Sequence, residues 1–314
     1  MRYSPKSRFQ GTFLGAFLGG SSASGGEIQS QNYLDFGRMA VLGTESLIAL
    51  GRLDIDDWIA RQQQESLHSA ATDDISIKII IATLPVALFF HENPIKLRQN
   101  LLHILKIWEN DPVVRDATLA VGYAIALALT EKLDPLTLIP QIISFIGETP
   151  TSIPKKLLKV QNLLEQGAGL EKVQAEFGRE EKLSNIIPMA FFCFLSTLED
   201  FRLAVLRATY NGNFKVQGAT SVSSQATGAI TGALSGAYNS TSGIPLNWRV
   251  LLLQRSSPVW GLTSFSQMLK LVDAFVAVWS GVYDLALNPR ELTEEGCEVA
   301  PLSVYAAPRV IRSR

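Results

Sequence analysis

Charged side chains are scarce in this sequence, and neither sign dominates. They make up 18% of the 314 residues, and the formal net charge is −1. The tightest basic group is Lys155, Lys156 and Lys159, a spacing that fits a solvated helix face. Because nucleic-acid-binding domains concentrate positive charge, we expect no nucleic-acid partner. The 47% apolar content predicts a large buried core instead.

Cysteine and long hydrophobic runs are rare as well. Cys193 and Cys297 lie far apart, which excludes a disulfide framework and favours a reducing compartment. The most apolar runs, 79–90 and 186–195, contain proline and are too short for a membrane span of about 20 residues. Glycines interrupt the apolar patch near the N-terminus, unlike the continuous core of a signal peptide. We therefore expect a cytoplasmic protein with no membrane segment.

Alternating strand patterns are missing, whereas helical periodicity covers most of the chain. Apolar residues recur three and four apart in segments such as 36–51, 112–130 and 264–278. The sequence contains no repeat of constant period, which argues against a solenoid. No break in composition marks a domain boundary. We predict an all-α fold with one domain over residues 1–286 and a surface tail over 287–314.

Local signals place some helix ends. Gly51 is typical of a helix stop, and Asp54 with Asp57 three residues later is typical of a helix N-terminus. The pattern from Asp73 or Asp74 to about residue 90 predicts a single helix, which His91 would end as a C-terminal positive charge.

Two stretches carry glycine at every fourth position. In one the glycines stand at 11, 15 and 19, and in the other at 228, 232 and 236. Each set lies on one helix face and predicts a ridge that another helix can approach closely. The second stretch lies in an uncharged span, 216–248, that is rich in hydroxyl and amide side chains. Such groups need hydrogen-bond partners or a ligand when they are buried.

These stretches also carry a family resemblance. RFQGTFLGAFLGG, GRMAVLGTESLIALGRLDIDDWIAR, PMAFFCFLSTLEDFRLAVLRATYNG and TGAITGALSGAYNSTSGIPLNW occur in this order. Over roughly residues 8–248 the chain resembles the ADP-ribosylglycohydrolase family. The resemblance implies a compact multi-helix bundle with a central cleft. It also implies removal of ADP-ribose from a modified side chain, with two divalent ions, Mg or Mn, bound by carboxylate-rich motifs.

Those motifs mostly fail to carry over. The register set by Glu45 and Ser46 puts residues 34–37 over a Thr-Asp-Asp-Thr motif, where Asp35 is the one carboxylate. Residues 223–226 fall over an Asp-x-Asp-Thr motif and contain no carboxylate. Glu27 matches a glutamate of the family, and Gly19 and Gly20 stand where the family has a Gly-Asp pair. The resemblance thus implies Glu27 and Asp35 as catalytic candidates, and as ligand-binding residues Gly19, Gly20, Ser223, Ser224 and Gln225.

Residues 72–74 offer another register, because Thr-Asp-Asp spells most of the second motif. They follow the helix that the motif should precede, so we favour a helix N-cap there.

Neutral side chains are poor substitutes for the lost carboxylates. A Mg²⁺ ion keeps its waters unless anionic ligands compensate, and two adjacent ions repel each other. Glu27 and Asp35 could hold one weak Mg or Mn ion, but we predict no two-metal site and no other cofactor. Metal-dependent hydrolysis should therefore be lost or strongly reduced.

Three functions remain open from the sequence. The first is an impaired enzyme that binds ADP-ribose, an ADP-ribosylated protein or another partner protein. The second is an active hydrolase with Glu27 or Asp35 as general base, its pKa raised by burial, and Ser223 and Gln225 orienting the substrate. The third is a structural or assembly protein of the same fold, in which late aromatic residues such as Trp260 form an oligomer face or simply a core.

Overall fold

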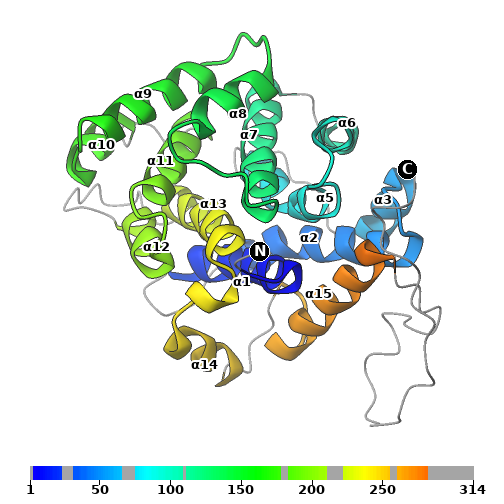
Figure 1. The fold of residues 1–314 in the computed structure, drawn as a ribbon. Coiled ribbons are helices and arrows are strands. Elements are labelled where there is room, and N and C mark those ends of the chain that lie inside the picture. The colour runs from blue at the N-terminus through cyan, green and yellow to red at the C-terminus, as the bar shows by residue number, and fades with distance from the viewer. Residues whose placement is uncertain are drawn as a thin grey trace.

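The computed structural model describes residues 3–22, 31–65, 75–108, 111–177, 183–210, 222–254 and 260–281. Over these ranges the chain forms helices and no β-strand, which confirms the all-α class (Figure 1). Glu27, Asp73, Asp74, Cys297 and the predicted tail over 287–314 lie outside the described residues. The single-domain boundary at residue 286 stays a prediction.

The helices follow one another through the described ranges, with two short 3₁₀ turns between them. In chain order they are α1 (Pro5–Ser22), α2 (Gln31–Leu50), α3 (Ile55–Gln64), α4 (Ile75–Ala82), α5 (Leu84–Phe89), α6 (Pro94–Ile104), η1 (Leu105–Ile107), α7 (Pro112–Leu129), α8 (Leu138–Ile146), α9 (Ile153–Glu165), α10 (Leu170–Phe177), α11 (Leu183–Leu195), α12 (Phe201–Thr209), α13 (Val222–Asn239), η2 (Thr241–Gly243), α14 (Leu246–Gln254) and α15 (Phe265–Ser280).

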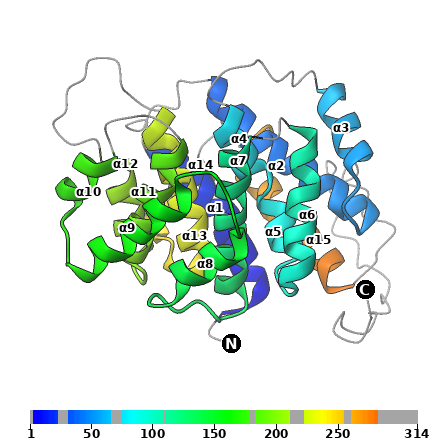
Figure 2. The ribbon, with the colours of Figure 1, turned by 90° about the horizontal axis from the view of Figure 1, so that it is seen from above.

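Helices α1 and α13 form the most extensive helix pair of the fold. Their glycine ridges face each other, and the pairing is antiparallel: Gly11 meets Gly236, Gly15 meets Gly232, and Gly19 meets Gly228. Together with α7 they lie between α9–α12 on one side and α2, α3, α5, α6 and α15 on the other (Figures 1 and 2). The close approach predicted for both ridges is confirmed, and each ridge is the other's partner.

Helix α7 is a core helix with a capped beginning. The Asp111 side chain accepts a hydrogen bond from the Val113 amide at 2.8 Å, and Pro112 takes the first helical position. Among the described residues, α7 alone is long and apolar enough to cross a membrane. However, 78% of its length is buried inside the protein, as in the core helix of a globular fold.

The fully buried Asp116 carboxylate of α7 accepts hydrogen bonds from Thr149 and Thr151, which fastens the loop after α8 to this helix.

Two predicted helix ends are confirmed, and one predicted helix differs from the structure. Gly51 has a positive φ of 63° after α2, and Asp54 caps α3 by accepting from the Asp57 amide. The single helix expected up to residue 90 is wrong, because the chain breaks at Thr83 into α4 and α5. Pro85 in the first turn of α5 has no amide hydrogen to donate back into α4.

The histidine after α5 also differs from expectation. His91 carries no helix-end charge: it is buried, and burial lowers its pKa to about 4. Its ring lies edge-on to Phe9 and 5.1 Å from the Trp279 ring, and its Nδ1 bonds the Leu88 carbonyl at 2.6 Å. A neutral imidazole is therefore part of the core.

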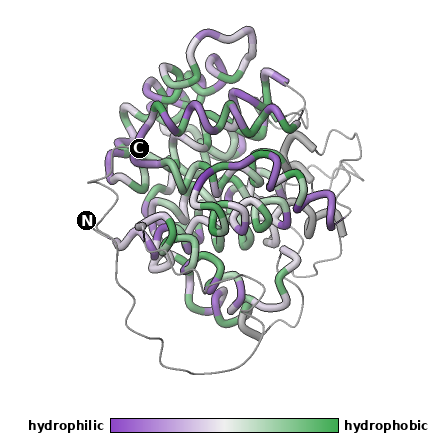
Figure 3. Tube along the Cα trace, turned by 90° about the vertical axis from the view of Figure 1, so that its right-hand side faces the viewer, coloured by the Kyte–Doolittle hydropathy of each residue, from purple (hydrophilic) through white to green (hydrophobic). Residues whose placement is uncertain are grey.

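The outer helices are amphipathic, as their sequence period predicts. Hydrophobic and hydrophilic residues alternate along them (Figure 3). In α9, Ile153, Leu157 and Val160 are buried while Lys159 is exposed.

Candidate functional site

The antiparallel pairing of α1 and α13 assembles the predicted ligand-binding residues at one end of the bundle. Gly19 lies in the last turns of α1 and contacts Gly228, the seventh residue of α13. Gly20 therefore lies near the beginning of α13, where residues 223–225 stand. Gly19 itself is in close contact with α13, so helix packing already accounts for this glycine.

The first turn of α13 is neutral and buried. Ser224 is 8% exposed and Gln225 is 7% exposed, and the turn contains no acidic residue. Ser223 is the second residue of the helix, and its side chain lies outside the described part of the structure. The amide groups of the first turn of an 18-residue helix carry partial positive charge. The first turn of α13 thus contains a hydroxyl and an amide side chain together with the backbone amides of a helix N-terminus.

The two candidate carboxylates are less well defined. Asp35 is in the second turn of α2, where only its backbone is described, and Glu27 lies between the described segments. Two residues after Asp35, the space that a side chain at Gly37 would occupy is filled by the indole ring of Trp260.

Trp260 anchors the segment before α15 between α1 and α2. It is 1% exposed, has a positive φ of 52°, and its ring lies about 6 Å from the rings of Phe13 and Phe17 on α1. A Cβ atom at Gly37 would overlap this ring, so the contact requires glycine. Of the core and oligomer-face alternatives for Trp260, the structure selects the core. No local sequence pattern indicates that Trp260 and Gly37 meet.

Polar residues farther along α13 find hydrogen-bond partners on α11, in the loop after α11 and on α13 itself. Thr231 donates to the Ala190 carbonyl of α11 at 3.3 Å. The Asn239 amide donates to the Leu198 carbonyl at 2.8 Å and to the Ser235 hydroxyl at 3.1 Å. The hydrogen-bonded alternative for the uncharged span therefore holds for this part of α13.

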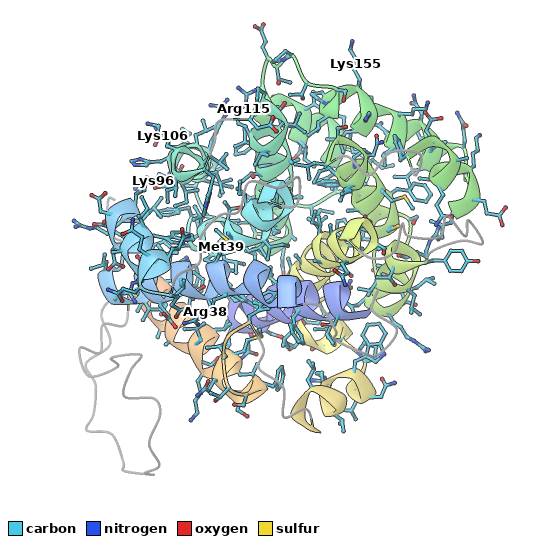
Figure 4. The ribbon with its side chains drawn as sticks, turned by 180° about the vertical axis from the view of Figure 1, so that it is seen from behind. Arg38, Met39, Lys96, Lys106, Arg115 and Lys155 are labelled. Carbon is cyan, nitrogen blue, oxygen red and sulfur yellow. The ribbon has the colours of Figure 1, made fainter. Side chains whose placement is uncertain are left out.

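An ion network fixes α3 against α2. Arg38 pairs with Glu65, and Glu45 lies 3.9 Å from both Arg38 and Arg61. Burial alone would lower the pKa of Arg38, but the hydrogen bond to Glu65 and the two carboxylate charges raise it. The Glu45 side chain is thus a structural partner of arginines on both helices. Figure 4 labels Arg38 on α2, the nearest member of this network to Asp35 in sequence.

Other chemically capable groups are buried or dispersed. Burial raises the pKa of the Cys193 thiol to about 12, so this cysteine is no nucleophile at neutral pH. Within the described ranges no three His, Cys, Asp or Glu side chains cluster closely enough to hold a metal ion. The basic residues that Figure 4 labels away from α2 belong to four different elements: Lys96, Lys106, Arg115 and Lys155.

Comparison with known protein families identifies the family of the chain. The family model described as ADP-ribosylglycohydrolase matches residues 27–284. The chain belongs to the ADP-ribosylglycohydrolase family. The match confirms the resemblance over residues 27–248 and extends past residue 248 to include α14 and α15. Residues 8–26, which contain RFQGTFLGAFLGG, lie outside the matched range.

The fold of this ADP-ribosylglycohydrolase-family protein is also found among solved structures. One of them, an "ADP-ribosylglycohydrolase-related protein complex", superposes with a TM-score of 0.59 at 16% sequence identity. The alignment covers 88% of this chain and 99% of that chain. At this identity the similarity establishes a shared fold. A comparison with curated protein sequences gives no significant match.

Proposed function

We propose that this ADP-ribosylglycohydrolase-family protein has lost two-metal hydrolysis and binds ADP-ribose, free or attached to a protein, without a metal. The observation that carries the proposal is the first turn of α13, where Ser224 and Gln225 are neutral and buried. The family resemblance puts carboxylates at this turn. The change removes the negative charge that would hold the ions.

The described residues do not fit a pair of Mg or Mn ions. Hard divalent cations in proteins are held mainly by carboxylates, and a neutral hydroxyl or amide does not replace that charge. Gly37 falls over the last position of the second motif, and the Trp260 indole fills the space beside it. An apolar ring offers no ligand to a hard cation. We therefore derive no metal-dependent step for this chain.

The same turn suits the pyrophosphate of ADP-ribose. Backbone amides at a helix N-terminus favour anions, and the absence of acidic side chains from this turn removes a source of repulsion. The Ser224 hydroxyl and the Gln225 amide are of the type that binds ribose hydroxyls. The proposal includes a cytoplasmic location, which agrees with the buried, unpaired Cys193 thiol.

An assay of ADP-ribose release from an ADP-ribosylated protein tests this proposal. We expect no turnover above background in Mn²⁺, Mg²⁺ or a chelator. Turnover that requires metal would contradict the proposal and restore an ordinary family hydrolase. Turnover without metal that disappears in a folded Glu27→Gln variant would favour the altered-mechanism hydrolase instead.

A further inference from the structure

A second candidate binding site lies on another side of the bundle. An open pocket of about 450 Å³ is formed by α8, α9, α11 and α12, and none of its lining residues belongs to α1, α2 or α13. Ligand pockets in proteins have volumes of about 300–1,000 Å³. Its apolar lining includes Ile139, Leu164, Phe192 and Leu195.

Arg207 is the positive charge of this pocket. Its guanidinium carbon lies 5.5 Å from the centre of the Phe192 ring, which holds the head group against the apolar surface. Its Nε is buried with no hydrogen-bond acceptor. No ion pair joins Arg207 to a carboxylate among the residues that the structure describes. A guanidinium in this state has capacity for an anionic partner.

The one carboxylate among the lining residues, Glu165, is bound by another lining residue, Gln161. Glu165 is exposed at the end of α9, and its Oε1 accepts a hydrogen bond from the Gln161 amide at 3.0 Å. Arg207 stands on α12 and Glu165 on α9, so the two charges come from different walls. A ligand with a single negative charge would bind at the Arg207 wall and direct its apolar part across Phe192 and Leu195.

We propose that this pocket binds a small organic acid, namely a carboxylate carried by an aromatic or branched apolar group. Arg207 pairs with the carboxylate through the planar fork of its guanidinium. Phe192 and Leu195 contact the apolar group. Because one charge and a limited apolar surface make up the site, the affinity for a simple acid should be in the millimolar range.

Fluorine NMR titration of the full chain with 4-fluorophenylacetate tests the site. The neutral 2-(4-fluorophenyl)ethanol should bind about tenfold more weakly, because it cannot pair with the guanidinium. An Arg207→Gln variant should lose about tenfold in affinity for the acid. Arg202→Gln, an exposed change on the same helix, should leave that affinity unchanged.

Two further variants keep the test decisive. Ala168→Leu narrows the pocket without changing charge and should weaken both the acid and the alcohol. If Arg207→Gln fails to fold, as circular dichroism would reveal, Arg207→Lys keeps the charge but loses the fork and should bind the acid with an intermediate affinity. Equal binding of acid and alcohol, equal affinities of the Arg202 and Arg207 variants, or no binding of the acid would each overturn the proposal.

Discussion

Gly15 on α1 and Gly232 on α13 lie in direct backbone contact. A Cβ atom added to either one would overlap the carbonyl oxygen of the other. A neighbouring side chain could move away from an added methyl group by changing its rotamer, but the backbone of a helix cannot. At this point the close approach of α1 and α13 therefore requires glycine on both helices.

Substitution Gly232→Ala should destabilise the protein by about 3 kcal/mol or more, since the helices must separate to admit the methyl group. Chemical unfolding followed by circular dichroism measures the change. Gly169→Ala is the matched control, because no atom lies within 4 Å of a Cβ added there. Equal midpoints for the two variants would show that the helix pair is looser than the structure indicates.

Arg8 should be the arginine on which stability depends most. It is 4% exposed and donates to the Ala128 carbonyl at 2.5 Å, to the Ala237 carbonyl at 3.1 Å and to the Glu131 carboxylate at 3.0 Å. It thus joins α1 to the last turns of α7 and α13. Arg8→Met removes these hydrogen bonds and the ion pair with Glu131, and should cost about 3 kcal/mol in the free energy of unfolding.

The control variant is Arg52→Met. The Arg52 side chain is 74% exposed and should contribute little to the free energy of unfolding. Urea denaturation of both variants gives the comparison. Equal urea midpoints for Arg8→Met and Arg52→Met would mean that water replaces the hydrogen bonds of Arg8.

His91 predicts a loss of stability in mild acid. Burial lowers its pKa from 6.5 to about 4, so the folded protein keeps it neutral while the unfolded chain binds a proton as the pH falls below 6.5. The free energy of unfolding should then fall between pH 6.5 and pH 4, by about 3 kcal/mol from this group. His91→Phe should flatten that slope, whereas the exposed His103→Gln should not. An unchanged slope in His91→Phe would assign the acid sensitivity to other groups.

A carboxylate returned to the first turn of α13 should weaken metal-free ADP-ribose binding. Gln225→Glu puts a negative charge beside the expected pyrophosphate, and we expect about a tenfold loss of affinity in chelator. Gln141→Glu, on the exposed side of α8, is the matched control. Unchanged affinity in folded Gln225→Glu would exclude this turn from the binding site.

Local structure was largely predictable from the sequence, and long-range contacts were not. Asp54 and Gly51 mark helix ends because capping depends on a few adjacent residues. The glycine period predicted two close-packing ridges, but spacing along one helix does not say which helix it meets. The break at Thr83 was hidden because the residues on both sides of it are apolar.

The candidate site shows the same division. The motif register predicts residues 223–225 just before the glycine-rich helix, whereas the structure includes them in the first turn of that helix, α13. The contact of Trp260 with Gly37 joins positions 223 residues apart and leaves no local pattern. The buried state of His91 likewise depends on Phe9 and Trp279 from two distant helices, so its charge could not be read from its position after an apolar helix.

Calorimetric titration of the purified protein with ADP-ribose, in Mn²⁺ and in chelator, tests the central claim most directly. The account predicts binding of the same affinity in both conditions. Binding that requires Mn²⁺ would contradict it, because carboxylates from elsewhere would then be holding the ion. Absence of binding in both conditions would contradict it too, and would leave the structural or assembly role as the better explanation.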